Sequence, residues 1–380
     1  MKIVIYSVVL NQHQAPVADE LWEMTHHEFA FVELTNLGDT KGGTEDYSGR
    51  SYLIRAWASP EANAKAMELS RTAGCCIFSG IEALPFQKER MKQGLLSFEM
   101  GERWLKRGLK SFASPRLEKW LIAYYLNGWS NKPLYKLCCS SFCAGDHYKM
   151  GTFNHKCYKW GYFTKVDSDF EVEAREQGAS TSEITPLMWC ARFLKLKHPE
   201  LPVQLAARLK TNGYKFVLDM YGSGEELECT KKLAQRLDVS DVVHFYGNLP
   251  NDQILEAMRK HSIFLFTSDK NEGWGAVLNE SMSNGCAVVA SNAIGSVHYL
   301  VRDCENGMIF NSEKIESLYE KVEYLLRHPV ERKKMAQNAY YTMRDVWSPA
   351  NAANNLIRLI EDLQQGRESS IVEGPCSKEV

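Results

Sequence analysis

The sequence predicts an α/β protein built around two mostly parallel sheets. Short runs rich in β-branched and aromatic residues alternate with longer amphipathic stretches from end to end, which is typical of layered α/β folds. The chain has 380 residues, more than one hydrophobic core usually holds. Apolar residues make up 44% and charged residues 24%, the balance of a globular protein. We therefore expect two domains, each with its own sheet.

The first half of the chain contains the less regular of the two patterns. Its apolar runs are short enough for strands, and amphipathic stretches of helical period separate them. We expect strands at 2–9, 29–34, 52–57, 75–79, 95–99, 135–141 and 157–163, with helices that include 60–73 and 115–126.

The second half repeats strand and helix more evenly. Strands are expected at 187–191, 215–221, 242–246, 262–267, 287–291 and 308–310, and helices near 199–212, 225–236, 251–260, 276–284 and 312–328. This alternation predicts a Rossmann-like domain, in which ligands bind outside the carboxyl ends of the strands.

A polar, acidic stretch without apolar periodicity separates the halves and predicts a linker. We expect the following division: an N-terminal domain at 1–164, the linker at 165–183, a C-terminal domain at 184–348, a last helix at 349–365 and a disordered tail at 366–380.

Charge and composition argue against several functional classes. The 45 basic and 47 acidic residues nearly cancel, so nothing predicts nucleic-acid binding by the whole molecule. No stretch reaches the roughly 18 apolar residues that span a bilayer, and the first residues read as a strand, which predicts a cytoplasmic protein. The eleven cysteines form no Cys-x-x-Cys pair, so we expect reduced thiols and no metal site. No Gly-x-Gly-x-x-Gly follows the first strand, which argues against a dinucleotide cofactor.

The run NEGWGAVLNESMSNGCAVVAS, which begins at residue 271, carries the strongest functional pattern. A helix beginning near Gly275 would direct free backbone N–H groups at an anion, and glycine allows the backbone to approach a phosphate closely. Two carboxylates flank this start: Glu272 before it and Glu280 in the first turns. The candidate ligand-binding residues here are Gly273, Trp274, Gly275, Ala276, Val277, Leu278 and Glu280. Spacing alone also fits an ordinary acidic helix start.

Three further segments follow predicted strands of the second half. Arg192 and Lys197 come after the strand at 187–191, where paired cations would stabilise a phosphate that leaves with negative charge. Lys195 competes for the same role. Gly222 and Gly224 form a Gly-x-Gly turn, and Tyr246 and Gly247 end the strand at 242–246. A surface basic cluster and a tight turn are the alternative interpretations.

These segments together resemble the donor site of GT-B retaining glycosyltransferases of the glycosyltransferase family 4 type. That family has two glutamates flanking seven residues around a Gly-aromatic-Gly, an Arg and Lys five residues apart, and a Gly-x-Gly turn. The resemblance covers the second half well. Ile294-Gly295-Ser296 departs from the family's Gly-Gly, with serine in one of the two positions.

The resemblance implies a GT-B fold, with two Rossmann-like domains facing across a cleft. It also implies a metal-independent hexosyltransferase that needs no cofactor and takes a nucleotide-sugar, expected to be a UDP-sugar, as donor. Arg192, Lys197 and Glu272 would be catalytic, and Glu280 would bind the ribose. Trp347-Ser348-Pro349 resembles the place where family chains cross back to the first domain.

The first half resembles the family less, so its candidate acceptor or cleft residues are weaker. They are Asn11, His13 and Gln14 after the first strand, with Glu102 and Asp146 after two later strands. Residues 86–136 hold eleven basic and four acidic side chains, interleaved with aromatics. Such a surface fits either contact with anionic lipid at the inner face of the plasma membrane or a solvated helix face.

The expected function is transfer of a sugar to a saccharide or lipid-linked acceptor in surface polysaccharide synthesis. Two alternatives remain open from the sequence. A nucleotide-sugar epimerase or hydrolase of the same fold would need its own acid/base pair. A non-catalytic nucleotide-sugar-binding protein would have lost charges that are all present here: Arg192, Lys197, Glu272 and Glu280.

Overall fold

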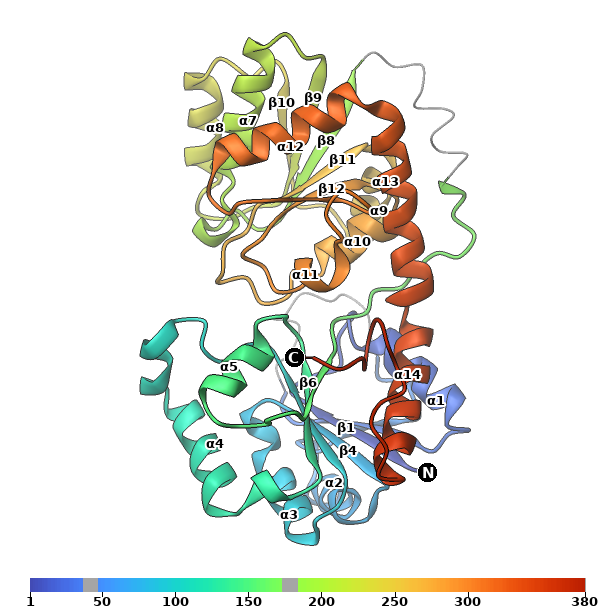
Figure 1. Cartoon of the computed structure of the whole chain (residues 1–380). Helices are drawn as coiled ribbons and strands as arrows, with labels where there is room; N and C mark the ends of the chain where they lie inside the picture. Colours follow the sequence, from blue (N-terminus) through green and yellow to red (C-terminus); the bar gives the residue numbers. More distant parts are fainter. Residues whose placement is uncertain (37–46, 173–183, 380) are drawn as a thin grey trace. The chain divides into compact units, whose positions relative to one another are not determined.

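The computed structural model describes residues 1–36, 47–172 and 184–379, and they form two compact units (Figure 1). The first unit contains residues 1–165 and 347–380, and the second contains residues 166–346. Most of the predicted linker, 173–183, lies outside the described residues. Within the described residues, no helix is both long and apolar enough to cross a bilayer.

The first unit holds a seven-stranded parallel sheet in the order β3-β2-β1-β4-β5-β6-β7. Its strands are β1 (Ile3–Ser7), β2 (Phe29–Glu33), β3 (Leu53–Arg55), β4 (Cys75–Ser79), β5 (Ser97–Gly101), β6 (Leu134–Cys138) and β7 (Cys157–Lys159). The helices of this unit are α1 (Ala15–Met24), α2 (Pro60–Thr72), α3 (Leu84–Gln93), α4 (Pro115–Leu126), α5 (Cys143–Lys149) and α14 (Pro349–Gln364). All seven strands were expected, with ends that differ by a few residues.

The second unit holds a six-stranded parallel sheet in the order β10-β9-β8-β11-β12-β13. Its strands are β8 (Thr185–Cys190), β9 (Phe216–Tyr221), β10 (Val243–Gly247), β11 (Ile263–Phe266), β12 (Ala287–Ser291) and β13 (Met308–Phe310). Its helices are α7 (Glu200–Thr211), α8 (Leu227–Arg236), α9 (Asn251–Lys260), α10 (Val277–Ser283), α11 (Val297–Leu300), α12 (Ile315–Arg327) and α13 (Pro329–Tyr341). The short α11 and the whole of α13 were not among the expected helices.

Local sequence signals fix the two clearest helix starts in the first unit. The Ser59 hydroxyl accepts from the Ala62 N–H at 3.1 Å, and the Ser348 hydroxyl accepts from the Asn351 N–H at 3.2 Å. Proline follows each serine, at the position where a helix needs no N–H. The second of these serines begins α14, which packs against α1.

The tail is ordered, so the prediction of disorder for 366–380 is wrong over the described residues. The Cys376 N–H donates to the Lys159 carbonyl at 2.7 Å, and the Glu379 N–H donates to the Cys157 carbonyl at 3.0 Å. Cys376 is fully buried. The polar composition predicted disorder, but these residues pair with β7, which would otherwise be an open edge of the sheet.

Both cores are strongly apolar, and most of the cysteines belong to them. All eleven cysteines lie within the described residues, eight of them are buried, and none is disulfide-bonded. Reduced thiols that pack as small apolar side chains were expected.

Candidate nucleotide-sugar site

The carboxyl edge of the second sheet brings the predicted donor residues together. Because every strand is parallel, the loops after β8, β9, β10 and β11 all leave the sheet at this edge. Arg192 and Lys197 follow β8, and Glu272 follows β11. The chain therefore gathers at one edge side chains that lie up to 80 residues apart.

Lys197 and Glu272 form an ion pair, which the sequence did not predict. Both side chains are 12% exposed, so solvent still reaches them. The Lys197 carbonyl accepts from the Thr267 hydroxyl at 2.7 Å, and this hydroxyl accepts from the Trp189 indole N–H at 2.9 Å. The buried chain of hydrogen bonds holds Lys197 beside the carboxylate. The competing Lys195 is exposed.

Arg192 is exposed, and its guanidinium has no ion pair or hydrogen bond within the described residues. An unpaired guanidinium at the same sheet edge as a paired lysine provides the charge that an incoming diphosphate needs. The two predicted cations thus differ: Lys197 is already neutralised, and Arg192 is available.

Gly222 and Gly224 hold the Arg192 segment in place. Both have positive φ, 124° and 151°. A Cβ on Gly222 would collide with the Ala191 carbonyl, and one on Gly224 would collide with the Phe193 carbonyl. The Phe193 N–H donates to the Ser223 carbonyl at 2.8 Å. Glycine is needed here for the approach of two protein loops, and it positions Arg192.

Tyr246 and Gly247 lie beside this turn. The Gly222 N–H donates to the Gly247 carbonyl at 2.7 Å. Tyr246 is 50% exposed and stacks on Tyr221 with ring centroids 4.9 Å apart and planes at 12°. A supported, exposed aromatic ring is a suitable platform for a flat base.

The segment from Gly273 to Leu278 differs from the prediction in one donor. The Leu278 N–H is used within the turn, because it donates to the Gly275 carbonyl at 2.9 Å. The N–H groups of Gly275, Ala276 and Val277 have no backbone acceptor within the described residues. Three donors, rather than four, are therefore available to an anion.

The Trp274 side chain and the Cβ side of Gly275 face packed protein, which leaves only backbone groups of this turn for a ligand. Trp274 is buried, and its indole N–H donates to Asn279 at 2.7 Å. A Cβ on Gly275 would collide with the Phe266 ring. The Ser296 hydroxyl donates to the Trp274 carbonyl at 2.5 Å. The serine that departs from the family's Gly-Gly thus fixes the loop through its side chain.

The Glu280 carboxyl has no hydrogen-bond partner within the described residues. Burial raises its pKa from 4.5 to about 7. Burial and the charge of Glu280 also raise the pKa of the Cys190 thiol to about 12, while the Lys197 charge lowers it. Lys197 and Glu280 therefore both act on one thiol at the end of β8, which the sequence did not single out.

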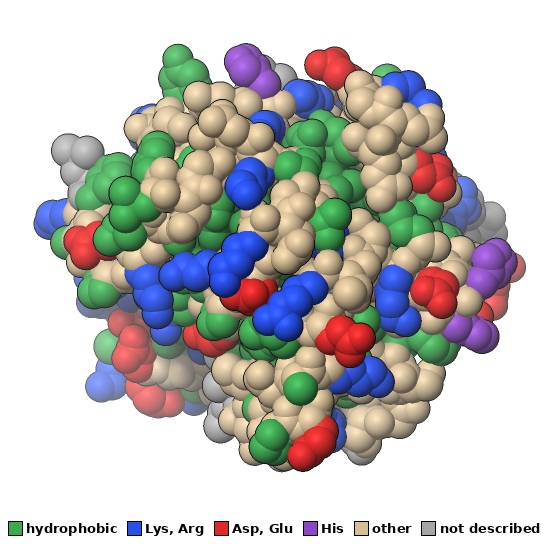
Figure 2. Space-filling model, turned by 90° about the horizontal axis from the view of Figure 1, so that it is seen from below, with side chains coloured by type: hydrophobic (Ala, Val, Ile, Leu, Met, Phe, Trp, Pro, Cys, Tyr) green, Lys and Arg blue, Asp and Glu red, His purple; other side chains and the backbone are tan. Residues whose placement is uncertain are grey.

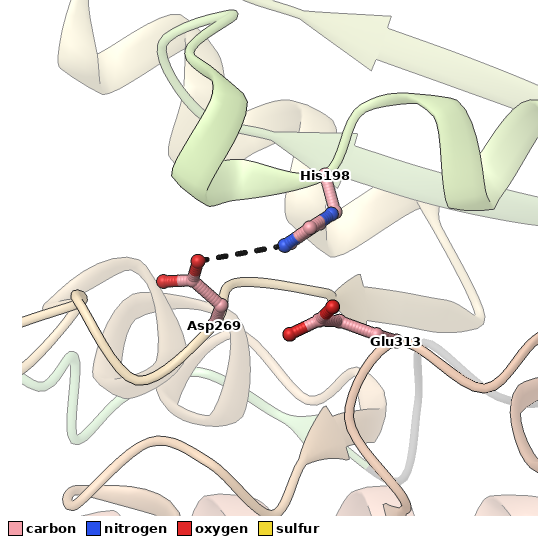
Figure 3. A group of neighbouring side chains, drawn as sticks. All are labelled: His198, Asp269 and Glu313. Atoms are coloured by element: carbon pink, nitrogen blue, oxygen red, sulfur yellow. Dashed lines mark ion pairs between the residues drawn. The ribbon is translucent and has the colours of Figure 1, made fainter.

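A histidine and two carboxylates lie at the same edge (Figure 3). The ligand atoms of His198, Asp269 and Glu313 all lie within 4.8 Å of one another, a group that could hold a metal ion. The His198 Nδ1 lies 2.7 Å from Glu200 and its Nε2 3.6 Å from Asp269. The hydrogen bond to Glu200 raises the pKa of His198, and the Asp269 and Glu313 charges act in the same direction. The expectation of no metal site stays a prediction.

In the first unit, the loop after β1 carries Asn11, His13 and Gln14. The Asn11 carboxamide oxygen accepts from the His13 N–H at 3.0 Å, and the Gln14 side chain donates to Ser7 at 3.3 Å. The His13 ring stacks on Tyr162 with centroids 6.0 Å apart, and burial lowers its pKa to about 4. His13 is therefore a neutral ring at neutral pH.

Tyr162 connects this loop to Glu102. Its hydroxyl donates to one Glu102 oxygen at 2.9 Å, and Lys106 lies 2.7 Å from the other. Tyr162 falls within the strand expected at 157–163. Because β7 ends at Lys159, Tyr162 lies in the loop that follows the strand.

The assignment of Asp146 to the cleft is wrong. Its side chain is 2% exposed, and its oxygens accept from Arg103 at 3.1 and 3.2 Å and from the Leu105 N–H at 2.9 Å. Both oxygens of the carboxylate accept hydrogen bonds within the protein. Asp146 positions the loop after β5.

The comparisons with known proteins agree with the geometry of the second unit. Residues 173–342 match the family model described as glycosyl transferases group 1. The second unit therefore matches the group 1 glycosyltransferase model over nearly its whole length. Three relatives support this: an uncharacterised glycosyltransferase of Haemophilus influenzae (32% identical), a D-inositol 3-phosphate glycosyltransferase of Streptomyces bingchenggensis (27%) and the lipopolysaccharide core biosynthesis glycosyltransferase LpsE of Rhizobium meliloti (28%).

These matches cover parts of the chains. They span 30%, 50% and 48% of this chain, and 31%, 43% and 54% of the three relatives. The chain therefore matches about half or less of each relative's own length.

Solved structures extend the likeness in fold to both units. Anabaena HepE in complex with UDP has a TM-score of 0.70 at 14% identity, over 96% of this chain and 100% of the other. Sucrose-phosphate synthase of Thermosynechococcus elongatus has a TM-score of 0.68 at 14% identity, with the same coverage. The group 1 domain and the first unit together have the GT-B fold.

Proposed function

We propose that this protein is a retaining glycosyltransferase that moves a hexose from a nucleotide-diphosphate donor to an acceptor hydroxyl. The observation that carries the proposal is the grouping at one sheet edge of an unpaired Arg192, the Lys197–Glu272 pair and the uncommitted Glu280 carboxyl. Each offers what one part of a nucleotide-sugar requires. The diphosphate needs cations, and the ribose diol needs a carboxylate acceptor.

The reaction exchanges one bond to the anomeric carbon for another. The bond from that carbon to the diphosphate oxygen breaks, and a bond to the acceptor oxygen forms on the same face. The acceptor's proton passes to the departing diphosphate oxygen. Negative charge grows on the diphosphate during the step, so cations and N–H groups already in place lower the barrier.

The described residues divide this work. Arg192 and the N–H groups of Gly275, Ala276 and Val277 hold the diphosphate. Lys197 exchanges the Glu272 carboxylate for phosphate oxygen, which frees Glu272 to accept sugar hydroxyls. Glu280 accepts from the ribose, and its raised pKa means that a bound diol replaces a proton as its partner. No step requires a metal or a protein nucleophile.

UDP is the donor nucleotide that we propose. The support is the likeness in fold to HepE, whose structure contains UDP, together with the exposed Tyr246 platform. A saccharide or lipid-linked acceptor in surface polysaccharide synthesis fits the likeness to a lipopolysaccharide core enzyme. A second relative is named D-inositol 3-phosphate glycosyltransferase, and this name supports an acceptor that carries phosphate.

We also propose peripheral contact with a membrane through the outer face of α4. Ile122, Tyr125 and Leu126 are 58%, 52% and 81% exposed on this helix. Exposed apolar side chains next to basic ones favour an interfacial position. Figure 2 shows one face of the molecule, on which hydrophobic side chains lie exposed among Lys and Arg side chains.

Incubation with a panel of nucleotide-sugars, with and without lipid-linked and soluble acceptors, tests the function. Transfer predicts nucleotide release that depends on acceptor, and a product whose anomeric configuration equals that of the donor. Release without acceptor would indicate a hydrolase. A changed sugar without release would indicate an epimerase, and inversion would contradict the retaining assignment.

A further inference from the structure

A cavity of about 640 Å³ lies in the first unit, beside the loop that follows β5. Its walls come from this loop, from the 3-10 helix Gly108–Ala113 and from the first turn of α4. Its charged lining residues are Glu102, Arg103, Lys106, Arg107, Lys110 and Arg116. Five positive charges thus face one negative charge.

Two of the five cations are already neutralised. Arg103 pairs with Asp146 at 3.1 Å, and Lys106 pairs with Glu102 at 2.7 Å. The side chains of Arg107, Lys110 and Arg116 are exposed and have no ion pair or hydrogen bond within the described residues. Three uncompensated positive charges therefore surround the cavity.

The cavity concentrates the charge of the basic stretch 86–136, because other cations of that stretch serve the interior. Arg90 is buried and donates to four backbone carbonyls, from Ser70 to Leu96. Lys136 is buried against Glu99, and Lys132 donates to the Met91 carbonyl at 2.6 Å. The sequence count of basic residues overstated the free surface charge and missed where it gathers.

The first turn of α4 adds donors to the same cavity. Ser114 precedes the helix without a side-chain cap, and Pro115 occupies the first position. The N–H groups of Arg116 and Leu117 have no backbone acceptor within the described residues. These donors and the helix dipole favour an anion where Arg116 also lies.

The cavity also has room and a wall for a sugar ring. Its volume lies in the usual range of small-molecule sites, roughly 300–1,000 Å³. Trp104 lines it and packs on Trp120, with ring centroids 5.3 Å apart. Through Glu102 and Tyr162 the cavity connects to the His13 loop at the carboxyl edge of the sheet.

We propose that this cavity binds the acceptor through a phosphate or diphosphate group. The identification of the ligand as the acceptor rests on the proposed function, but the presence of an anion site does not. A diphosphate ester carries about two to three negative charges, which matches the three uncompensated cations. A flat membrane surface would instead contact the outer face of α4, where Leu126 lies.

Binding of inorganic pyrophosphate, measured by calorimetry, tests the anion site without turnover. The starting protein is the Arg192→Ala/Lys197→Ala variant, which weakens the donor diphosphate site. We expect binding that falls about tenfold for Lys110→Gln and roughly a hundredfold for Lys110→Gln/Arg116→Gln. The matched control is Lys119→Gln, an exposed lysine of α4 that does not line the cavity. No binding, or an equal loss for Lys119→Gln, would overturn the proposal.

Turnover and vesicles distinguish the sources of the anion. With the wild-type donor site, Lys110→Gln/Arg116→Gln should raise the KM for a phosphate-bearing acceptor and leave the KM for the donor unchanged. Vesicles of phosphatidylcholine with added phosphatidylglycerol should still bind this double variant. They should bind the Leu126→Glu variant more weakly than the wild-type protein. If the double variant lost vesicle binding and kept pyrophosphate binding, the cavity would be a membrane contact. If pyrophosphate bound as expected but no sugar were transferred, the proposed function would fail and the anion site would stand.

Discussion

The two sheets end in charged loops, but the two units hold their free positive charge differently. At the edge of the second sheet, Lys197 has Glu272 as a partner before any ligand arrives. In the first unit, Arg107, Lys110 and Arg116 line a cavity without a protein partner among the described residues. A lysine with a carboxylate to return to suits a ligand whose diphosphate departs each cycle. Arg192 is also unpaired, so the contrast lies in the lysine: Lys197 has a carboxylate to pair with when the diphosphate leaves, and the three exposed cations of the cavity have none among the described residues.

The largest effect should come from the lysine on the departing side. Lys197→Ala removes charge stabilisation of the leaving diphosphate, so kcat should fall about 10²- to 10³-fold. Lys195→Ala is the matched control, because Lys195 is exposed two residues away, and it should retain near-parental kcat. Steady-state kinetics with a UDP-sugar measures both. A larger effect of Lys195→Ala would assign stabilisation of the leaving diphosphate to Lys195. The contrast between a paired lysine in the second unit and unpaired cations in the first would then no longer hold.

The next largest effect concerns the loop that positions Arg192. Gly222→Ala places a Cβ against the Ala191 carbonyl and should lower the free energy of unfolding by about 3 kcal/mol or more. Gly247→Ala shares the positive φ, 73°, but has nothing within 4 Å of its Cβ. It should cost only about 1–2 kcal/mol. If denaturant unfolding gave the two variants equal losses of stability, the positive φ alone would explain the need for glycine at position 222.

Glu280→Gln should weaken UDP binding about tenfold but raise the free energy of unfolding at pH 8. The Glu280 pKa of about 7 lies above its unfolded value of 4.5, so the folded protein loses stability as pH rises through this interval. Glutamine removes that loss, and the variant should be more stable than the parent at pH 8 but not at pH 4. Calorimetric titration and thermal unfolding at both pH values check this. Unchanged UDP affinity would contradict the assignment of Glu280 to the ribose.

The smallest effects should appear in two histidines that titrate in opposite directions. The His13 pKa is lowered to about 4, so its contribution is present above about pH 6.5 and is lost as pH falls toward 4. The His198 pKa is raised, so its contribution is complete below about pH 6.5 and is lost at higher pH. His13→Gln should therefore gain stability relative to the parent at pH 5. His198→Asn should lose stability at pH 6 but not at pH 9.

The sequence predicted the second unit better than the first, for physical reasons. Strands buried on both faces, such as β11 and β12, are short apolar runs, and their neighbours in the sheet follow the same even spacing. All six of β8–β13 were recognised, as were the seven strands of the first unit. Motif residues at the ends of those strands meet because parallel strands share an edge. What spacing could not predict was partnership: that Lys197 would find Glu272, or that Leu278 would use its N–H within the turn.

In the first unit the errors arose from long-range contacts. Asp146 looked like a site residue because it follows a strand, yet Arg103, 43 residues earlier, occupies it. The tail looked disordered because its composition is polar, yet β7 offered it an unpaired edge. The positive charge of the cavity depends on which basic residues form ion pairs or hydrogen bonds elsewhere in the unit. Those partners are distant in the sequence, so local patterns do not predict them.

The division of the chain also bears on the order in which the protein is made. The second unit is one continuous segment, so it can fold as soon as residue 346 has left the ribosome. The first unit must wait, because α14 packs on α1 and residues 376–379 pair with β7. Until then its sheet has an open edge and a bare helix face. The half of the molecule that is synthesised first is thus the half that is completed last.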